Sequence, residues 1–484
     1  MIGEQDLVYV HGEAESLPDG WKVTTLEGLI SDNGQFCDGD WVESKDQDPN
    51  GDVRLIQLAD IGVAAYRDRS DRYLTSERAS ALSCTFLQRG DILVARMPDP
   101  LGRACLFPGD KKRAVTVVDV AVIRPNNPEV DCRWLMHRIN SMEFRNAVAS
   151  LQSGSTRLRI SRRNLSRIAF PLPPLAVQLA EVDELEKQFS RLDEAVANLR
   201  RVKANLKRYK ASVLKDAVEG RLVPTEAELA RREGRTFETG EQLLQRILEE
   251  RRAKWSGKGK YKEPIDPDTS DLPNLPEGWT WARLDSLAAL KGGITVDSKR
   301  VDPSAQPVPY LRVANVQRGY IDLAEVKHIN ASAADIAELR LEHGDVLFNE
   351  GGDRDKLGRG WIWEGQLSDC IHQNHVFRAR MFLPEMAPKL VSWWGNTFGK
   401  DYFQRMGKQT TNLASINMGK LSGFPVPIPP AAEQRRMVEE IERLLSVVDR
   451  VAVEVDANLR RAEALRQSCL GSAFSPAKTE GIPL

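Results

Sequence analysis

Two long stretches of the chain carry apolar residues at the spacing of a coiled coil. After residue 175 the intervals between apolar positions alternate between three and four, and a looser stripe follows residue 431. This alternation is the heptad seam along which helices pack. Because neither helix can bury its stripe alone, we predict that the two pack on each other, the first stripe continuing to Val202 and Tyr209. The predicted seam residues are Val182, Leu185, Phe189, Leu192, Val196, Leu199, Val438, Ile441, Leu445 and Val448.

Before each helix the apolar runs are short. Runs such as 92–94 and 117–123 are bounded by Gly, Pro and Asp, which predicts strands with some helices. The expected fold class is therefore α+β, with two similar mixed α/β domains separated by a long antiparallel two-helix coiled coil. The predicted divisions are a first domain at 1–175, a spacer helix at 176–222, a linker with a short helix at 223–274, a second domain at 275–430, a second spacer helix at 431–475 and a tail at 476–484.

The chain contains an internal repeat with an offset near 256 residues. Four motifs recur in order: LPDGW as LPEGW, LQRGDILV as LEHGDVLF, FPLPPLAVQ as PVPIPPAAEQ, and ANLRR in both halves. The repeated tryptophans, Trp21 and Trp279, are expected to plug the two cores. The stretches 22–86 and 280–340 share little sequence, so the motifs of the scaffold are repeated while the residues between them differ. A protein that performs the same task on two different targets would have this organisation.

Composition and charge narrow the class of protein. Apolar residues make up 41% of the 484 residues, and 68 Lys and Arg nearly balance 69 Asp and Glu, giving a net charge of −1. A protein that binds nucleic acid must then use local patches. No apolar run is long enough for a membrane span, no secretory signal is evident, and the six cysteines form no CxxC pair. We therefore expect a cytoplasmic protein without structural zinc.

One basic patch lies at the end of the first domain. Residues 153–167 contain five arginines and no acid, and 406–420 is the corresponding stretch in the second half. Arg binds phosphate and guanine edges, whereas Gln and Asn read adenine. The candidate DNA-binding residues are Thr156, Arg157, Arg159, Arg162, Arg163, Lys408, Gln409, Thr410 and Asn412. The alternative for each is a solvated loop, and the acidic stretch 38–52 is open to the same alternative or to a role in binding cytosine amino groups.

Motifs for catalysis are missing from the sequence. The glycines at 395–400 have the wrong spacing for a phosphate-binding loop, and no GxGxxG follows a predicted strand. His372 and His375 lie three residues apart, but the sequence places no carboxylate or cysteine to complete a metal site. We therefore predict no catalytic residues, no metal and no cofactor on this chain.

Two unlike domains on paired helices suit duplex DNA with two separate half-sites. Antiparallel helices fit the order domain, helix, domain, helix, although 223–274 is long enough to allow a parallel pair. Differing domain contents predict an asymmetric pair of half-sites. A fused enzyme with unrecognised motifs and a coiled-coil scaffold without a DNA role are the alternatives.

The whole pattern resembles the specificity subunit of type I restriction-modification systems. The resemblance is carried by LPDGW and LPEGW, by GDILVAR and GDVLFNE, and by the proline motifs that precede the long helices. The stretch YKASVLKDAVEGRLVP at 209–224 and the run at 255–279 are also typical of the family. It implies two target-recognition domains for double-stranded DNA in a phage-defence complex, and helices that fix the spacer and dock two methyltransferase subunits. S-adenosylmethionine and adenine-N6 methylation would belong to those subunits, and ATP and Mg to two motor/nuclease subunits. The resemblance implies a non-catalytic chain and carries over no DNA-binding residue by motif.

Overall fold

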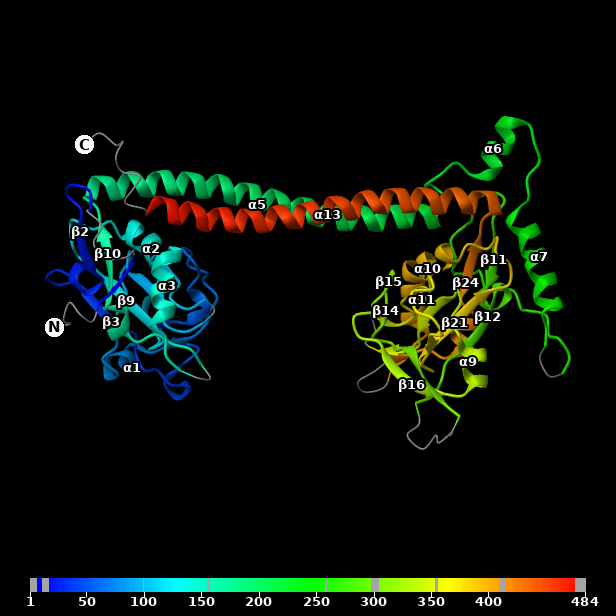
Figure 1. The fold of residues 1–484 in the computed structure, drawn as a ribbon, viewed down its shortest axis with the longest axis horizontal. Coiled ribbons are helices and arrows are strands. Elements are labelled where there is room, and N and C mark those ends of the chain that lie inside the picture. The colour runs from blue at the N-terminus through cyan, green and yellow to red at the C-terminus, as the bar shows by residue number, and fades with distance from the viewer. Residues whose placement is uncertain are drawn as a thin grey trace. The chain divides into compact units, whose positions relative to one another are not determined.

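The computed structural model describes residues 7–10, 17–98, 100–154, 157–256, 259–296, 304–352, 356–409 and 414–474. The chain divides into two compact units, which are coloured by residue number in Figure 1. Unit 1 comprises Met1–Arg201 and Val455–Leu484, and unit 2 comprises Val202–Glu454. No helix of the described part of the chain is long and apolar enough to cross a membrane.

The expected fold class is confirmed, because mixed α/β domains are combined with two long antiparallel helices, α5 (Leu175–Val218) and α13 (Ala431–Ala473). In unit 1 the beginning of α5 packs against the end of α13, where Arg466 Nη1 lies 2.5 Å from Asp193 Oδ1. In unit 2 the end of α5 packs against the beginning of α13, where Lys210 Nζ lies 3.2 Å from Asp449 Oδ1. Each long helix therefore contributes to both units.

The globular part of unit 1 is built on an antiparallel sheet with the order β3-β9-β6-β7. Side chains alternate between its faces: Ile92 and Val94 pack with α2 and α3, whereas Leu93 packs with the β5-β4-β8 sheet. A third sheet has the order β1-β10-β2. The bounds are β1 Val8–Tyr9, β2 Lys22–Thr25, β3 Gln35–Asp38, β4 Val53–Ile56, β5 Tyr73–Leu74, α1 Ser76–Ala81, β6 Ile92–Ala95, β7 Ala104–Leu106, β8 Arg113–Thr116, β9 Val120–Arg124, α2 Cys132–Asn140, α3 Met142–Ser150, α4 Arg162–Leu165 and β10 Ile168–Leu172.

Unit 2 repeats this plan with an antiparallel sheet of order β12-β21-β17-β19. Val346 and Phe348 pack with α10 residues on one face, and Leu347 faces the other side. The remaining sheets are β16-β13-β20, β11-β24, β14-β15 and β18-β23-β22. The bounds are α6 Glu226–Glu233, α7 Gly240–Ala253, β11 Thr280–Arg283, α8 Leu284–Leu287, β12 Ala288–Gly292, β13 Gln306–Leu311, β14 Val316–Gln317, β15 Tyr320–Ile321, β16 Lys327–Ala331, α9 Ala333–Leu339, β17 Val346–Asn349, β18 Gly351–Gly352, β19 Gly360–Ile362, β20 Ile371–His372, β21 Val376–Met381, α10 Pro388–Asn396, α11 Phe398–Met406, β22 Lys408–Gln409, β23 Ala414–Ser415, α12 Met418–Ser422 and β24 Pro425–Ile428.

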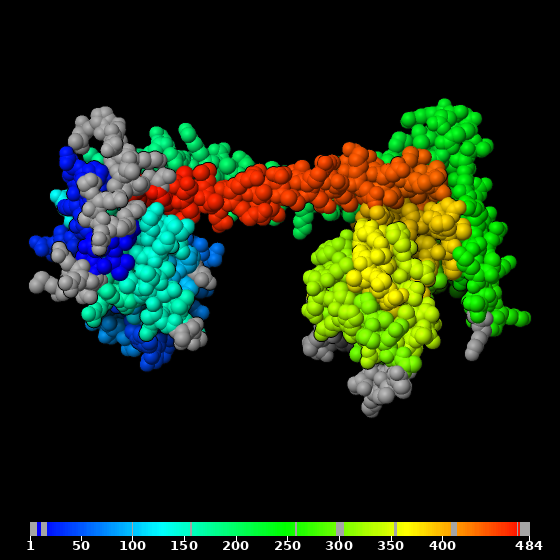
Figure 2. All heavy atoms as spheres, viewed as in Figure 1, coloured from blue at the N-terminus to red at the C-terminus, as the bar shows by residue number. Residues whose placement is uncertain are grey.

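The predicted seam is only in part a contact between helices. Val182, Leu185 and Phe189 are buried in the core of unit 1, together with α2, α3 and the end of α13. Ile441 is buried in unit 2 with α10, and Figure 2 shows this orange part of α13 resting on the yellow surface of the same unit. Val448 is also buried. The other predicted seam positions, which are partly buried, are Leu192, Val196, Leu199, Val438 and Leu445.

Two sequence predictions about apolar residues are wrong. Val202 and Tyr209 are 40% and 48% exposed, so they are not buried seam positions as the apolar spacing predicted. Trp279 is buried and its Nε1–H donates to Glu433 Oε1 at 3.0 Å, as expected of a core plug. Trp21 is only half-buried.

A buried glutamine ties each long helix to its globular domain. Gln178 Oε1 accepts the Asp131 N–H at 2.9 Å, and its Nε2 donates to the Pro173 carbonyl at 2.8 Å. Gln434 makes the corresponding bonds with the Ala387 N–H and the Pro429 carbonyl, both at 2.9 Å. Both glutamines are fully buried. The repeated proline runs therefore end in a hydrogen-bonded junction, which we call the glutamine clamp.

Replacing Gln178 with Met should destabilise unit 1. The thioether fills similar space but leaves the partly buried Asp131 N–H and the Pro173 carbonyl without their partner, at a cost of roughly 2–4 kcal/mol. Chemical denaturation measures the loss. Gln188→Met changes an exposed glutamine on the same helix and should alter stability by less than about 0.5 kcal/mol. Equal stability of the two variants would contradict the clamp.

Candidate nucleic-acid interface

A groove in unit 1 lies beside the end of β6. It joins two of the predicted arginines, Arg157 and Arg159, to the acidic loop at 40–47, whose Trp41 is 70% exposed. The groove thus combines cations, carboxylates, amides and an aromatic ring, which are the groups that contact phosphates and base edges. Its lining residues are Asp40, Trp41, Val42, Glu43, Ser44, Gln47, Gln57, Leu58, Ala59, Met97, Val117, Val118, Asp119, Gly154, Arg157 and Arg159.

The arginine-bearing loop is held by backbone hydrogen bonds. Ser153 and Arg159 exchange two N–H to carbonyl bonds, each 2.9 Å long. Gly154 has a φ of +105°, and a Cβ there would lie 2.3 Å from the Arg157 carbonyl oxygen, so the turn requires glycine. Arg96, which follows β6, accepts the Ile160 N–H at 3.1 Å and donates from Nε to the Ile160 carbonyl at 2.9 Å. The loop is therefore fastened to the central sheet, and the side chains of Arg157 and Arg159 remain exposed.

The other predicted arginines lie on α4, outside the lining of the groove. Arg162 donates from Nη1 to the Phe36 carbonyl at 3.0 Å and has its Nε 3.9 Å from Asp38 Oδ2. Asp38 also pairs with Arg96 Nη1 at 2.6 Å. Arg162 and Arg163 are both exposed, but Arg162 is partly engaged in holding the domain. Thr156 lies outside the described residues.

The described part of the second stretch contributes two strands to a small sheet in unit 2. Lys408 and Gln409 form β22, which pairs with β23, and β23 in turn pairs with β18. Ile416 donates its N–H to the Glu350 carbonyl at 2.8 Å, the same bond that Ile160 makes with Arg96 in unit 1. The side chains of Lys408 and Gln409, and all of Thr410 and Asn412, lie outside the described part of the chain.

Sequence reasoning missed one carboxylate at this edge. Glu350 Oε2 lies 2.6 Å from Nδ1 of the exposed His375, whereas His372 is buried and hydrogen-bonded to the Val376 carbonyl at 2.7 Å. The two imidazoles therefore have separate partners. The signal available in the sequence was the last residue of GDVLFNE, the repeat position of Arg96. Among the residues the structure describes, no group of three or more His, Cys, Asp and Glu side chains could hold a metal ion.

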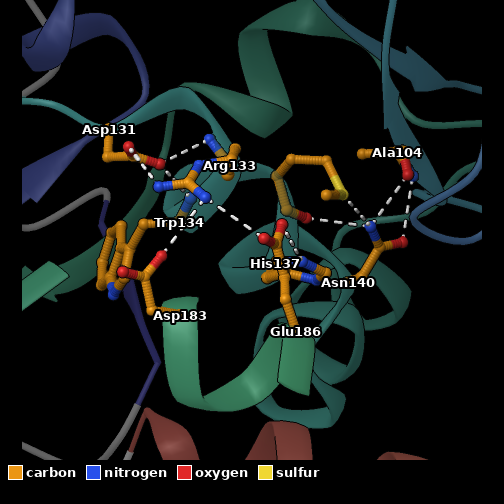
Figure 3. Close-up of polar contacts among 9 residues, drawn as sticks. Ala104, Asp131, Arg133, Trp134, His137, Asn140, Asp183 and Glu186 are labelled. Atoms are coloured by element: carbon orange, nitrogen blue, oxygen red, sulfur yellow. Dashed lines mark hydrogen bonds and ion pairs between the residues drawn. The ribbon is translucent and has the colours of Figure 1, made fainter. Parts of the chain in front are cut away.

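Charged groups orient the first domain on α5. Figure 3 shows Arg133 of α2 between Asp131, Asp183 and Glu186, with atoms 3.2–3.5 Å apart. Burial, together with two nearby arginines, lowers the pKa of His137 to about 4, so this imidazole is neutral at pH 7. The junction therefore combines partly exposed ion pairs of Arg133 with a buried, neutral His137.

Glu181 lies at the same junction and accepts a hydrogen bond from Trp134 Nε1 at 2.7 Å. Burial raises the pKa of its carboxyl to about 7, well above the ordinary value of 4.5. A raised folded-state pKa contributes stability that is complete below pH 4.5 and is lost as the pH rises through 7.

Glu181→Gln should therefore make unit 1 more stable than the original chain at pH 8, by ~1–2 kcal/mol, and nearly equal to it at pH 5. The amide oxygen still accepts the Trp134 hydrogen bond and carries no charge. Chemical denaturation at the two pH values measures the difference. Glu184→Gln, at an exposed position one turn along, should show no such pH dependence; a matching dependence would contradict the assignment.

No family model matches the chain, but curated relatives share much of its length. The EcoKI type I restriction enzyme specificity subunit from Escherichia coli K12 is 22% identical over 70% of this chain. The matched region spans 64% of that relative, slightly less than two thirds. The EcoAI and EcoEI specificity subunits from Escherichia coli are 22% and 21% identical, each over 94% of this chain and 83% of the relative.

Two solved structures share the fold over nearly the whole chain. The HsdS subunit from Thermoanaerobacter tengcongensis matches with a TM-score of 0.53 at 16% identity, covering 95% of this chain and 98% of that one. A chain from a structural study of complex assembly and conformational transition in the type I R-M system matches with a TM-score of 0.59 at 18% identity, covering 95% and 99%.

Proposed function

Since this chain belongs to the family of type I restriction enzyme specificity subunits, we propose that each of its two globular domains reads one half of an asymmetric, bipartite DNA sequence. Subunits of this family recognise DNA and are non-catalytic parts of restriction-modification complexes, in agreement with the prediction that this chain is not an enzyme. Its activity belongs to the complex, and its own contribution is the choice of sequence.

One observation carries the proposal: the two units hold unlike side chains on the same backbone. The Ile160 and Ile416 N–H groups bond to the carbonyls of Arg96 and Glu350, which follow equivalent strands. Hydrogen bonds between backbone groups are insensitive to side-chain identity. The loops that bear Ile160 and Ile416 are held by the same backbone hydrogen bond but have different side chains beside them. This difference favours two half-sites of different sequence.

We propose that α5 and α13 set the distance between the half-sites and dock the partner subunits. The helices are 44 and 43 residues long, or roughly 65 Å at 1.5 Å per residue. Within unit 2 they expose Val202, Tyr209 and Val453, which are 40%, 48% and 64% accessible. Exposed apolar positions beside charged ones are suited to protein contacts. The proposed partners are two methyltransferase subunits, which bind S-adenosylmethionine, and two motor/nuclease subunits, which use ATP and Mg, in the cytoplasm.

Replacing Arg157 and Arg159 with Ala should weaken specific DNA binding by about tenfold or more and lower its salt dependence, because two phosphate-binding cations are lost. Gel shifts of the chain with its methyltransferase subunits, at two salt concentrations, measure both effects. The control is Arg89→Ala with Lys111→Ala. These exposed cations lie in the turns before β6 and after β7, at the opposite end of that hairpin. Equal binding by both double variants would contradict the groove as a DNA site.

Inserting one helical turn into α5 should widen the preferred spacer by one or two base pairs. The insertion lengthens the helix by about 6 Å, and base pairs are stacked 3.4 Å apart. Genome-wide mapping of methylated bases in cells expressing the complex gives the spacer directly. Four residues added to the linker at 263–270 should leave it unchanged. Intact half-sites with an unaltered spacer in the α5 variant would refute the measuring role of the helices.

A further inference from the structure

We propose that His375, held by Glu350, is a specificity-determining residue of the second domain and contacts a base edge in its half-site. The proposal rests on the proposed function and deepens it, since it names a residue that selects the sequence. It arises from comparing the two units, because Glu350 and His375 occupy the same positions in the repeat as two residues beside the candidate DNA groove of unit 1.

Glu350 and His375 occupy the repeat positions of Arg96 and Asp119. The Arg96 N–H donates to the Asp119 carbonyl at 2.9 Å, and the Glu350 N–H donates to the His375 carbonyl at 2.9 Å. In both units the first residue follows the central strand (β6 or β17) and the second precedes its neighbour (β9 or β21). The two pairs are thus placed by the same backbone geometry.

In unit 1 this position faces the candidate DNA groove. Asp119 lines the groove together with Arg157 and Arg159. Arg96 fastens the arginine loop and pairs with Asp38 at 2.6 Å. The equivalent position in unit 2 therefore lies where a second DNA-contacting surface is expected.

In unit 2 the contact between Glu350 and His375 leaves the Nε2 atom of His375 available to a ligand. His375 Nδ1 lies 2.6 Å from Glu350 Oε2, and because a carboxylate only accepts, Nδ1 carries the proton. The His375 side chain is 54% exposed, whereas that of Glu350 is 27% exposed. Nearby, burial lowers the pKa of His372 to about 4, and its Nδ1 bonds to the Val376 carbonyl, which fastens the turn. Glu350 thus orients the His375 ring on a firm loop, leaving Nε2 for a ligand.

The chemistry of Nε2 matches the major groove. A neutral ring accepts from the amino group of adenine or cytosine, and a protonated ring donates to guanine. In unit 1, Asp119 can only accept from amino groups at the corresponding place. One position in the repeat, occupied by Asp in one copy and His in the other, therefore gives two domains different preferences without a change of scaffold.

The test is methylation mapping with His375→Ala in the full complex. We expect one position of the second domain's half-site to become degenerate, while the other half-site is unchanged. In gel shifts the preference for the cognate base over a substitution at that position should fall by about tenfold. His343→Ala is the matched control: this exposed histidine precedes β17, at the opposite end of the strand from Glu350, and should leave the motif intact.

Glu350 is tested as a positioning residue. Glu350→Ala should relax the same position as His375→Ala, and the double variant should be no more relaxed than His375→Ala alone, since the two residues act as a unit. Glu350→Gln keeps an oxygen that accepts the Nδ1 proton and should retain more of the preference than Ala. Degeneracy at a different position, or additive losses, would overturn this role.

An unchanged motif in His375→Ala would overturn the proposal. So would a uniform loss of binding with a smaller salt dependence, which is the behaviour of a phosphate contact. Both results are separable from failure of the proposed function, because loss of binding in the Arg157 and Arg159 double variant tests DNA recognition without His375.

Discussion

The structure depends on how a long helix is attached to the domain before it, and the glutamine clamp makes that attachment directional. Apolar burial is roughly proportional to area and has no preferred direction. The amide of Gln178 joins the N-terminus of α2 to the proline run before α5, and Gln434 does the same for α10 and α13. Because both amides are buried, a rotated helix would leave polar groups unpaired at considerable cost. The clamp therefore selects one orientation of the helix on its domain.

Buried charged groups also favour one orientation of each long helix on its domain, and these groups differ between the two units. In unit 1, Arg138 is buried at the junction, where it donates to the Phe474 carbonyl at 3.4 Å and stacks on the Phe474 ring. In unit 2, the buried Glu433 accepts from Trp279 and from the Glu226 N–H. Buried charged groups add little net stability, but losing a partner is strongly destabilising. Their effect is to penalise alternative packings, which matters when helix direction determines where a domain faces.

The sequence was sufficient for features that depend on local spacing. The apolar intervals after residue 175 predicted α5, and the looser apolar stripe after residue 431 predicted α13. The sequence could not show that Phe189 packs on the first domain, because that depends on where α2 and α3 lie. Glu350 was missed for the same reason: its partner is 25 residues away. Likewise, Arg162 looked equivalent to Arg157 in the sequence, but its contact with Phe36 separates them.

Duplication explains how recognition can diverge while the fold persists. The residues after β6 and β17 are held through their main chains, so their side chains can be exchanged without loss of those bonds. Each side chain nevertheless has its own polar partner nearby: Asp38 for Arg96 and His375 for Glu350. Replacing one member alone would leave its partner unpaired or facing a like charge. A change of specificity at the residues after β6 and β17 is therefore expected to require paired substitutions. The two domains would then diverge through groups of contacting residues that change together.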